Sequence, residues 1–298
     1  MLLPLFSSCG LFDKEIRQDK EIAAYRNRMN RILDSLSNPV ERVGAFEVLI
    51  EDINTNKALI TLRKKNMLLI DANTLISNIY YDIQDLDNTL KYNNIIIALD
   101  PTRASSYFYR GCTYQEFSKD SLAIIDYTQA IQLNNNYAEA FYNRGIIYEK
   151  NTRYKEALAD YDQAAKLKPR CIADVYNNRG NVYLALRDTV KALNDYTTVL
   201  KMDTTNINAY TNRAGLYIKL NDMNKALVDC NKALKLDSLS VRLYRQRAEI
   251  YSAKKEYDEA IADYKVILKL DPHDKYKIRE ESLDSIEKLR KLDKKSSM

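Results

Sequence analysis

The stretch that decides the fold reads ADVYNNRGNVYLALRDTVKALNDYTTVLKM and covers residues 173–202. Its first half is centred on Gly180, with Tyr176 four residues before it and Tyr183 three residues after it. Spacings of four and three place these side chains on one stripe of an α-helix. The second half repeats the spacing with Ala192, Tyr196 and Val199. The stretch therefore predicts two amphipathic helices in succession.

The same pattern recurs along the chain with a period of about 34 residues. In the first helix a small residue follows an arginine each time, at Gly111, Gly145, Gly180, Ala214 and Ala248. In the second helix the small residue is always alanine, at Ala123, Ala157, Ala192, Ala226 and Ala260. One helix pair cannot bury its aromatic side chains alone, so we expect several pairs to stack and share a core.

The order of aromatic, small residue, tyrosine, alanine, aromatic and alanine, closed by Pro169 or Pro272, resembles the tetratricopeptide repeat. The resemblance covers residues 104–274 as five units, which are 104–137, 138–172, 173–206, 207–240 and 241–274. It implies an all-α fold, a right-handed α-α superhelical solenoid of tandem tetratricopeptide repeats. It also implies that the protein is a non-catalytic scaffold for binding another protein.

The segments outside these five units are predicted to be helical as well. Residues 70–103 fit the pattern except at Asn73 and Asn93, which stand where aromatics belong, so we interpret them as a degenerate repeat. Residues 13–69 are predicted to form an N-terminal helical cap or eroded repeats, with a helix boundary at Asn38–Pro39. The last segment, 275–298, is predicted to be a capping helix with a basic tail.

Composition argues against catalysis and against nucleic-acid binding. The chain has 46 basic and 41 acidic residues, a mixture of signs that gives a net charge of only +5 and no basic footprint for nucleic acid. Its one histidine, His273, has no evident partner for acid, base or metal chemistry, and the four cysteines form no CxxC pair. We therefore expect no enzyme activity, no cofactor and no metal.

Two polar residue types recur in all five units. Arginine precedes the small residue at Arg110, Arg144, Arg179, Arg213 and Arg247. Aspartate follows the small residue by fifteen positions at Asp126, Asp160, Asp195, Asp229 and Asp263. A partly buried guanidinium is best satisfied by a bidentate carboxylate, so an ion pair between helices is predicted. The alternative is that the arginines contact a ligand.

A row of side-chain amides is the predicted binding surface. Asparagine lies two residues before the small residue in three units, and such amides can pair with a peptide backbone without reading its sequence. The resemblance to peptide-scanning tetratricopeptide repeats implies that the inner groove is lined by Tyr142, Asn143, Asn177, Asn178, Asn181, Asn212, Arg242 and Arg245. The alternative is that the asparagines only cap local contacts between adjacent repeats.

A second binding mode known in this family implies a different kind of partner. The two-carboxylate clamp of co-chaperone repeats is matched at Asn181, Asn212 and Arg242, but Asn177 and Gln246 stand where basic residues are expected. The alternatives are therefore a co-chaperone-like or assembly adaptor that recognises a peptide C-terminus or a folded domain, or a regulatory domain of an enzyme complex. The oligomeric state is left open by the sequence.

The first residues resemble part of a targeting signal. Residues 1–12 begin with an apolar stretch followed by Ser7, Ser8 and Cys9, which resembles the end of a bacterial lipoprotein signal. The resemblance implies lipidation of Cys9 and a place in the cell envelope, with this anchor as the only membrane contact. Such a protein would fractionate with membranes, whereas the alternative is a cytoplasmic protein.

Overall fold

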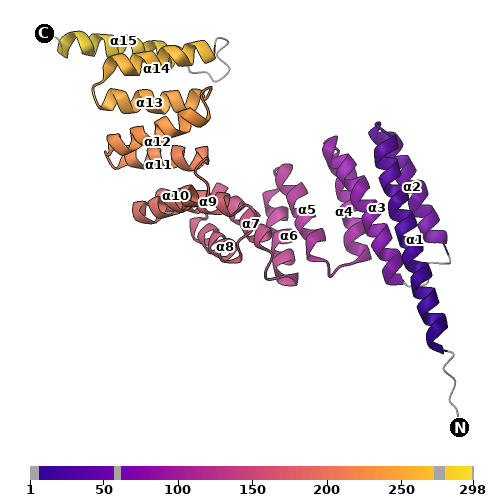
Figure 1. The fold of residues 1–298 in the computed structure, drawn as a ribbon. Helices are drawn as coiled ribbons and strands as arrows, with labels where there is room; N and C mark the ends of the chain where they lie inside the picture. The colour runs from indigo at the N-terminus through magenta and orange to yellow at the C-terminus, as the bar shows by residue number, and fades with distance from the viewer. Residues whose placement is uncertain (1–6, 57–61, 272–278, 297–298) are drawn as a thin grey trace. The chain divides into compact units, whose positions relative to one another are not determined.

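The structure is a computed structural model that describes the backbone of residues 7–56, 62–271 and 279–296, with side chains from Asp19 to Asp293. Within these ranges every regular element is an α-helix, and the helices follow one another along the chain as Figure 1 shows. The predicted all-α fold of consecutive helix pairs is thereby confirmed. The helices fall into two compact units, residues 1–147 and 148–298, which are described separately. Cys9 lies in α1, but its side chain and His273 are outside the described parts.

The first unit contains three helix pairs and the start of a fourth. Its helices are α1 (Ser7–Ser35), α2 (Pro39–Thr55), α3 (Leu62–Asp82), α4 (Leu86–Leu99), α5 (Ala104–Glu116), α6 (Asp120–Leu133) and most of α7 (Ala138–Lys150). The boundary at Asn38–Pro39 is confirmed, because the Asn38 side chain accepts a hydrogen bond from the Val40 N–H at 2.8 Å. Since α3 begins at Leu62, the predicted start of the degenerate repeat at residue 70 falls inside this helix.

The second unit contains the remaining repeats and the C-terminal helix. Its helices after α7 are α8 (Tyr154–Leu167), α9 (Ile172–Ala185), α10 (Thr189–Met202), α11 (Ile207–Lys219), α12 (Met223–Leu236), α13 (Val241–Ala253), α14 (Tyr257–Leu270) and α15 (Arg279–Ser296). Ile286 and Leu289 of α15 are buried in the same cluster as Ile261 and Tyr264 of α14. The last helix therefore covers the apolar side of the last pair.

From the α3–α4 pair onward, the turn within each pair uses a left-handed residue that is not glycine. Six such turns have φ between 57° and 64°, at Gln84, Ser118, Thr152, Arg187, Asn221 and Lys255. At Arg187 the next N–H, that of Asp188, bonds back to the Tyr183 carbonyl at 2.8 Å, which closes a Schellman-type end to α9. Asp188 then caps α10 through a bond from the Lys191 N–H. The residue that ends α9 and the residue that caps α10 are thus adjacent in the sequence.

The two helices of a pair pack closely where the small residue of the first helix meets the aromatic residue of the second. A Cβ atom added to Gly111 would lie 2.8 Å from the ring of Tyr127, and one added to Gly180 would lie 2.7 Å from the ring of Tyr196. Both tyrosines are fully buried. The glycines are therefore required by ring contact between helices, and not by backbone conformation.

A polar cluster replaces this packing in the degenerate repeat. Asn93 takes the place of the buried tyrosine and is 6% exposed. Its side chain accepts a hydrogen bond from the Ser77 hydroxyl at 2.9 Å and donates one to the Thr113 hydroxyl at 3.2 Å. Asn73, also buried, donates to the Leu69 carbonyl. The buried polar side chains that depart from the repeat pattern thus have hydrogen-bond partners on α3, α4 and α5.

The arginine and aspartate that recur in every unit form the predicted ion pairs. Bidentate pairs join the two helices of one repeat at Arg110–Asp126, Arg179–Asp195, Arg213–Asp229 and Arg247–Asp263. Their nitrogen–oxygen distances are 2.7–2.9 Å, and hydrogen bonding to the carboxylate raises the pKa of each arginine. Each guanidinium also lies against two tyrosine rings of its own helix, for example Arg213 against Tyr210 and Tyr217.

The same arginines also contact the second helix of the preceding pair. The remaining nitrogen of each of these four arginines donates to a polar side chain of the preceding second helix, at Asn94, Asp162, Thr197 and Asn231. Arg144 donates to Thr128 in the same way. These acceptors lie sixteen or seventeen residues before the arginine. Each of the four paired arginines therefore links three helices. A lysine could not reproduce the bidentate pair.

The buried tyrosine hydroxyls are satisfied by acceptors on the first helix of the same pair. Tyr127 donates to Gln115 at 2.6 Å, and Tyr161 donates to Glu149 at 2.6 Å. Burial raises the pKa of the Glu149 carboxyl above its ordinary value, although the bond from Tyr161 opposes this shift. Ionised Glu149 is therefore a source of instability at neutral pH.

Replacing Glu149 with glutamine is expected to stabilise the protein at neutral pH. Because the folded-state pKa of Glu149 is raised, its favourable contribution is complete below pH 4.5 and is lost as pH rises through the folded pKa. Glutamine stays neutral and keeps an acceptor for Tyr161, as Gln115 does for Tyr127. We expect Glu149→Gln to raise the melting temperature by about 1–3 °C at pH 7.5, with the difference vanishing at acidic pH. An equal shift at both pH values would contradict this explanation.

Candidate functional site

The predicted amide row lies on successive first helices of the second unit. Asn178 is on α9, Asn212 on α11 and Gln246 on α13, each two residues before the small residue. The helices α9 and α11 contact each other, as do α11 and α13. All three side chains are half-buried, and Asn212 makes no hydrogen bond within the described part of the unit. The Gln246 amide donates to the Thr211 carbonyl at 3.1 Å, so it bridges two neighbouring first helices.

Two of the predicted contact residues make hydrogen bonds within the protein. Asn177 is only 4% exposed, and its amide nitrogen lies 3.4 Å from the side-chain oxygen of Asn206, the residue that caps α11. The oxygen of Asn181 accepts a hydrogen bond from the Tyr196 hydroxyl at 2.7 Å. Buried Asn177 therefore does not face an open groove, which corrects that expectation. Asn181 is half-buried, and its contact with a peptide stays a prediction. The occupied Asn181 also counts against the two-carboxylate clamp.

The two predicted arginines differ in their surroundings. Arg242 is exposed at the start of α13 and has no ion pair among the residues described. Arg245 is bonded to Glu281 of α15 at 2.7 Å and lies 3.4 Å from Glu249. A ligand at Arg245 would therefore have to compete with the C-terminal helix, whereas Arg242 is open to a partner.

Tyr142 and Asn143 belong to the first unit, apart from the other six predicted residues. Both are half-buried on α7. The Asn143 amide lies 3.4 Å from the Tyr127 hydroxyl and 3.5 Å from the sulfur of Cys112, whose thiol pKa is raised by burial. Asn143 thus also has a packing role, and its contact with a peptide stays a prediction.

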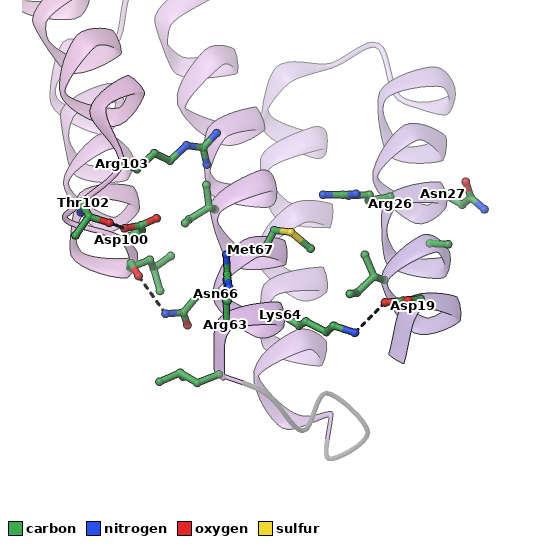
Figure 2. Close-up of a pocket in the computed structure, with 15 residues that line it drawn as sticks. Asp19, Arg26, Asn27, Arg63, Lys64, Asn66, Met67, Asp100, Thr102 and Arg103 are labelled. Carbon is green, nitrogen blue, oxygen red and sulfur yellow. Dashed lines mark hydrogen bonds and ion pairs between the residues drawn. The ribbon is translucent and has the colours of Figure 1, made fainter. Parts of the chain in front are cut away.

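A cavity in the first unit was not predicted from the sequence. It lies between α1, α3 and the segment from α4 to α5, and its volume is about 1420 Å³ (Figure 2). Its apolar lining consists of Ile22, Ala23, Leu62, Met67, Ile70 and Leu99. Its charged lining consists of Asp19, Arg26, Arg63, Lys64, Asp100 and Arg103. Figure 2 shows Arg26 and Arg103 reaching toward the cavity from opposite sides.

Most of the polar groups around this cavity have partners. Lys64 bonds Asp19 at 2.8 Å, and Arg26 bonds Asp71 through two nitrogens at 2.9 and 3.0 Å. Asp100 accepts bonds from the N–H and hydroxyl of Thr102. Arg63 and Arg103 are the cations of this lining that have no carboxylate partner within the described ranges.

The arrangement offers binding chemistry. No group of three or more histidine, cysteine, aspartate or glutamate side chains suited to a metal ion occurs among the residues whose positions are described. None of the described helices has the length and apolar character required to cross a bilayer. The surfaces of the two units carry side-chain amides, cationic side chains and apolar side chains. Such groups can hold another molecule in place.

Comparison with known families and structures agrees with this architecture. Models described as tetratricopeptide repeat match residues 138–171, 173–206, 207–238 and 241–274, and a model described as TPR repeat matches residues 119–151. Together they cover just over half of the chain. No curated protein sequence matches it.

Three solved structures illustrate the shared fold. The C-terminal part of a tetratricopeptide repeat protein from Cytophaga hutchinsonii has 18% identity and a TM-score of 0.64, covering 88% of this chain and 99% of its own. A repeat protein from Parabacteroides merdae has 17% identity and a TM-score of 0.60, covering 90% and 99%. YrrB, described as having an unusual peptide-binding site, has 17% identity and a TM-score of 0.51, covering 61% and 93%. The chain belongs to the tetratricopeptide repeat family.

Proposed function

We propose that this protein is a non-catalytic scaffold that holds an extended segment of a partner protein along the first helices of its second unit. The observation that carries the proposal is the row of amides at Asn178 and Asn212 on the consecutive first helices α9 and α11, with Gln246 linking α13 to α11 beside them. The peptide-binding site of YrrB, a structure of the same fold, supports a peptide as the kind of ligand.

The chemistry of an amide suits this task because it both donates and accepts. An extended backbone alternates N–H and C=O groups, so one asparagine can satisfy a donor and an acceptor of the bound segment. Exposed Arg242 adds a cation at the edge of the row. Each hydrogen bond contributes about 0.5–1.5 kcal/mol net, and the helices are already held by their ion pairs, so the ordering cost falls on the peptide. Micromolar affinity is the expected result.

The experiment begins with capture of a partner from cells that express the intact chain, followed by crosslinking to identify the bound segment. The test variant is Asn178→Ala/Asn212→Ala, which removes two amides of the row. The matched control is Asn194→Ala/Asn224→Ala, two asparagines on the second helices α10 and α12. We expect the first variant to lose most of the captured segment and the control to retain it, with helicity unchanged in both. Equal recovery by both variants would place the interface elsewhere.

A further inference from the structure

A second cavity in the first unit adjoins the large one at Arg103. A smaller cavity of about 270 Å³ shares Arg103 with the large one, and its other lining residues are Thr74, Asn78, Ile96, Ser105, Ser106 and Tyr109. The lining therefore follows α3 from Leu62 to Asn78. At 1.5 Å per residue this is about 24 Å of helix. We call the two cavities together the α3 channel.

The length of the channel favours a peptide over a small molecule. An extended chain rises about 3.3 Å per residue, so about seven residues would be needed to follow the channel from end to end. Its floor offers apolar surface at the larger cavity, including Leu62, 73% exposed, and Met67, 36% exposed. Aliphatic side chains of a bound segment could cover this surface, which is otherwise in contact with water.

The charge of the channel favours an acidic occupant. Its two carboxylates, Asp19 and Asp100, already have hydrogen-bond partners within the channel lining. Arg63 and Arg103 have no carboxylate among the described residues, and the Nε of Arg103 is bonded only to the Ser105 hydroxyl at 2.9 Å. Arg103 also precedes the first turn of α5, where the helix dipole adds positive potential.

Ser106 supplies an independent sign that the channel receives a ligand. Its side chain lines the smaller cavity and the residue is only 6% exposed, yet its hydroxyl has no hydrogen-bond partner. A buried hydroxyl without a partner is costly, and the cost is removed when a ligand supplies an acceptor. A carboxylate or a peptide carbonyl in the smaller cavity would do so.

We propose that the α3 channel is a second protein-binding site and that its occupant is an acidic segment of a partner with interspersed aliphatic side chains. Its carboxylates bond Arg63 and Arg103, its aliphatic groups cover Leu62 and Met67, and a carbonyl or carboxylate accepts from Ser106. The site lies in the first unit and is independent of the amide row on α9, α11 and α13. The protein would thus bind two segments by different chemistry.

The test uses three labelled ten-residue peptides and the full chain, with binding followed by fluorescence anisotropy at low and moderate salt. The first peptide contains glutamate and leucine between serines, the second has lysine for glutamate, and the third has serine for leucine. We expect the first to bind at micromolar concentration and more weakly as salt rises, the third to bind at least tenfold more weakly, and the second not to bind. Equal binding of the first two peptides, or no binding of the first at 1 mM, would reject the proposal.

Variants locate the binding. Arg63→Glu/Arg103→Glu is expected to weaken the first peptide at least thirtyfold, while Arg31→Glu/Lys119→Glu, with the same charge change at exposed positions outside the channel, stays within about threefold. Ser106→Ala should weaken binding a few-fold without lowering the melting temperature.

The Asn178→Ala/Asn212→Ala variant should bind the first peptide normally, which separates this site from the amide row. Equal loss in both charge variants, or binding of laurate in place of the peptide, would overturn the assignment.

Discussion

Arg213→Ala is expected to lower the free energy of unfolding by about 3 kcal/mol, because it leaves Asp229 buried without its partner. The Asp229 side chain is 3% exposed, and Arg213 contacts it through two nitrogens at 2.7 and 2.9 Å. The bond to Thr197 on the preceding pair is lost as well. Thermal or urea unfolding of the full chain measures the change, which corresponds to a fall in melting temperature of about 6–12 °C.

Two controls separate the buried carboxylate from other effects of losing Arg213. Exposed Arg170 is not part of any ion pair within the described ranges, so Arg170→Ala should change stability by less than about 0.5 kcal/mol. The double variant Arg213→Met/Asp229→Leu removes both charges and should recover much of the loss. If Arg213→Ala kept full stability but lost partner binding, the arginine would be a ligand contact and the structural role would be wrong.

Gly180→Ala is expected to destabilise the second unit by about 1–3 kcal/mol through overpacking. The new Cβ would lie 2.7 Å from Cε1 of Tyr196, a ring with no exposed surface into which it could turn. The chain offers a natural comparison, because the α11–α12 pair has Ala214 and the smaller Cys230 at the corresponding positions, both fully buried. The α13–α14 pair has Ala248 and Tyr264 at these positions, and Tyr264 is 9% exposed whereas Tyr196 is fully buried.

The comparison sets up a double-mutant cycle. Tyr196→Cys alone is expected to cost stability because a buried ring is lost. In that background Gly180→Ala should cost little, since the pair then resembles Ala214 and Cys230. If Gly180→Ala cost the same in the unaltered chain and in the Tyr196→Cys background, the ring would not be the reason for the glycine. Chemical unfolding of the four proteins gives the coupling energy.

The fold could be predicted from the sequence because the repeats can be aligned with one another, which shows the positions that keep the same type of residue. A small residue at every Gly180 position and an aspartate fifteen positions later identified both the helix contact and the ion pair. The acceptors on the preceding helix were missed, since Asn94, Thr128 and Asp162 differ in residue type. The left-handed turns were also missed, because residues such as Ser118 and Arg187 occupy positions where glycine is the usual signal.

The candidate site was less accessible to sequence reasoning. The family resemblance implied that Asn177 lines the groove together with Asn178, but it could not show that the side chain of Asn177 contacts Asn206 before α11. The α3 channel lies in the part of the chain that departs most from the repeat. Its signal was a stripe on α3 with steps of three and four, at Arg63, Met67, Ile70, Thr74 and Asn78. That stripe mixes polar and apolar residues, so it does not stand out as a core face.

The central claim is that amides on the first helices of the second unit hold an extended segment of a partner. The most direct measurement is titration calorimetry of the captured segment against the unaltered chain and the Asn178→Ala/Asn212→Ala variant, with Asn194→Ala/Asn224→Ala as control. Loss of about two to four hydrogen bonds predicts a dissociation constant at least tenfold higher for the first variant and an unchanged value for the control. A first variant that binds the segment with undiminished affinity would contradict the claim and leave Asn178 and Asn212 as structural residues.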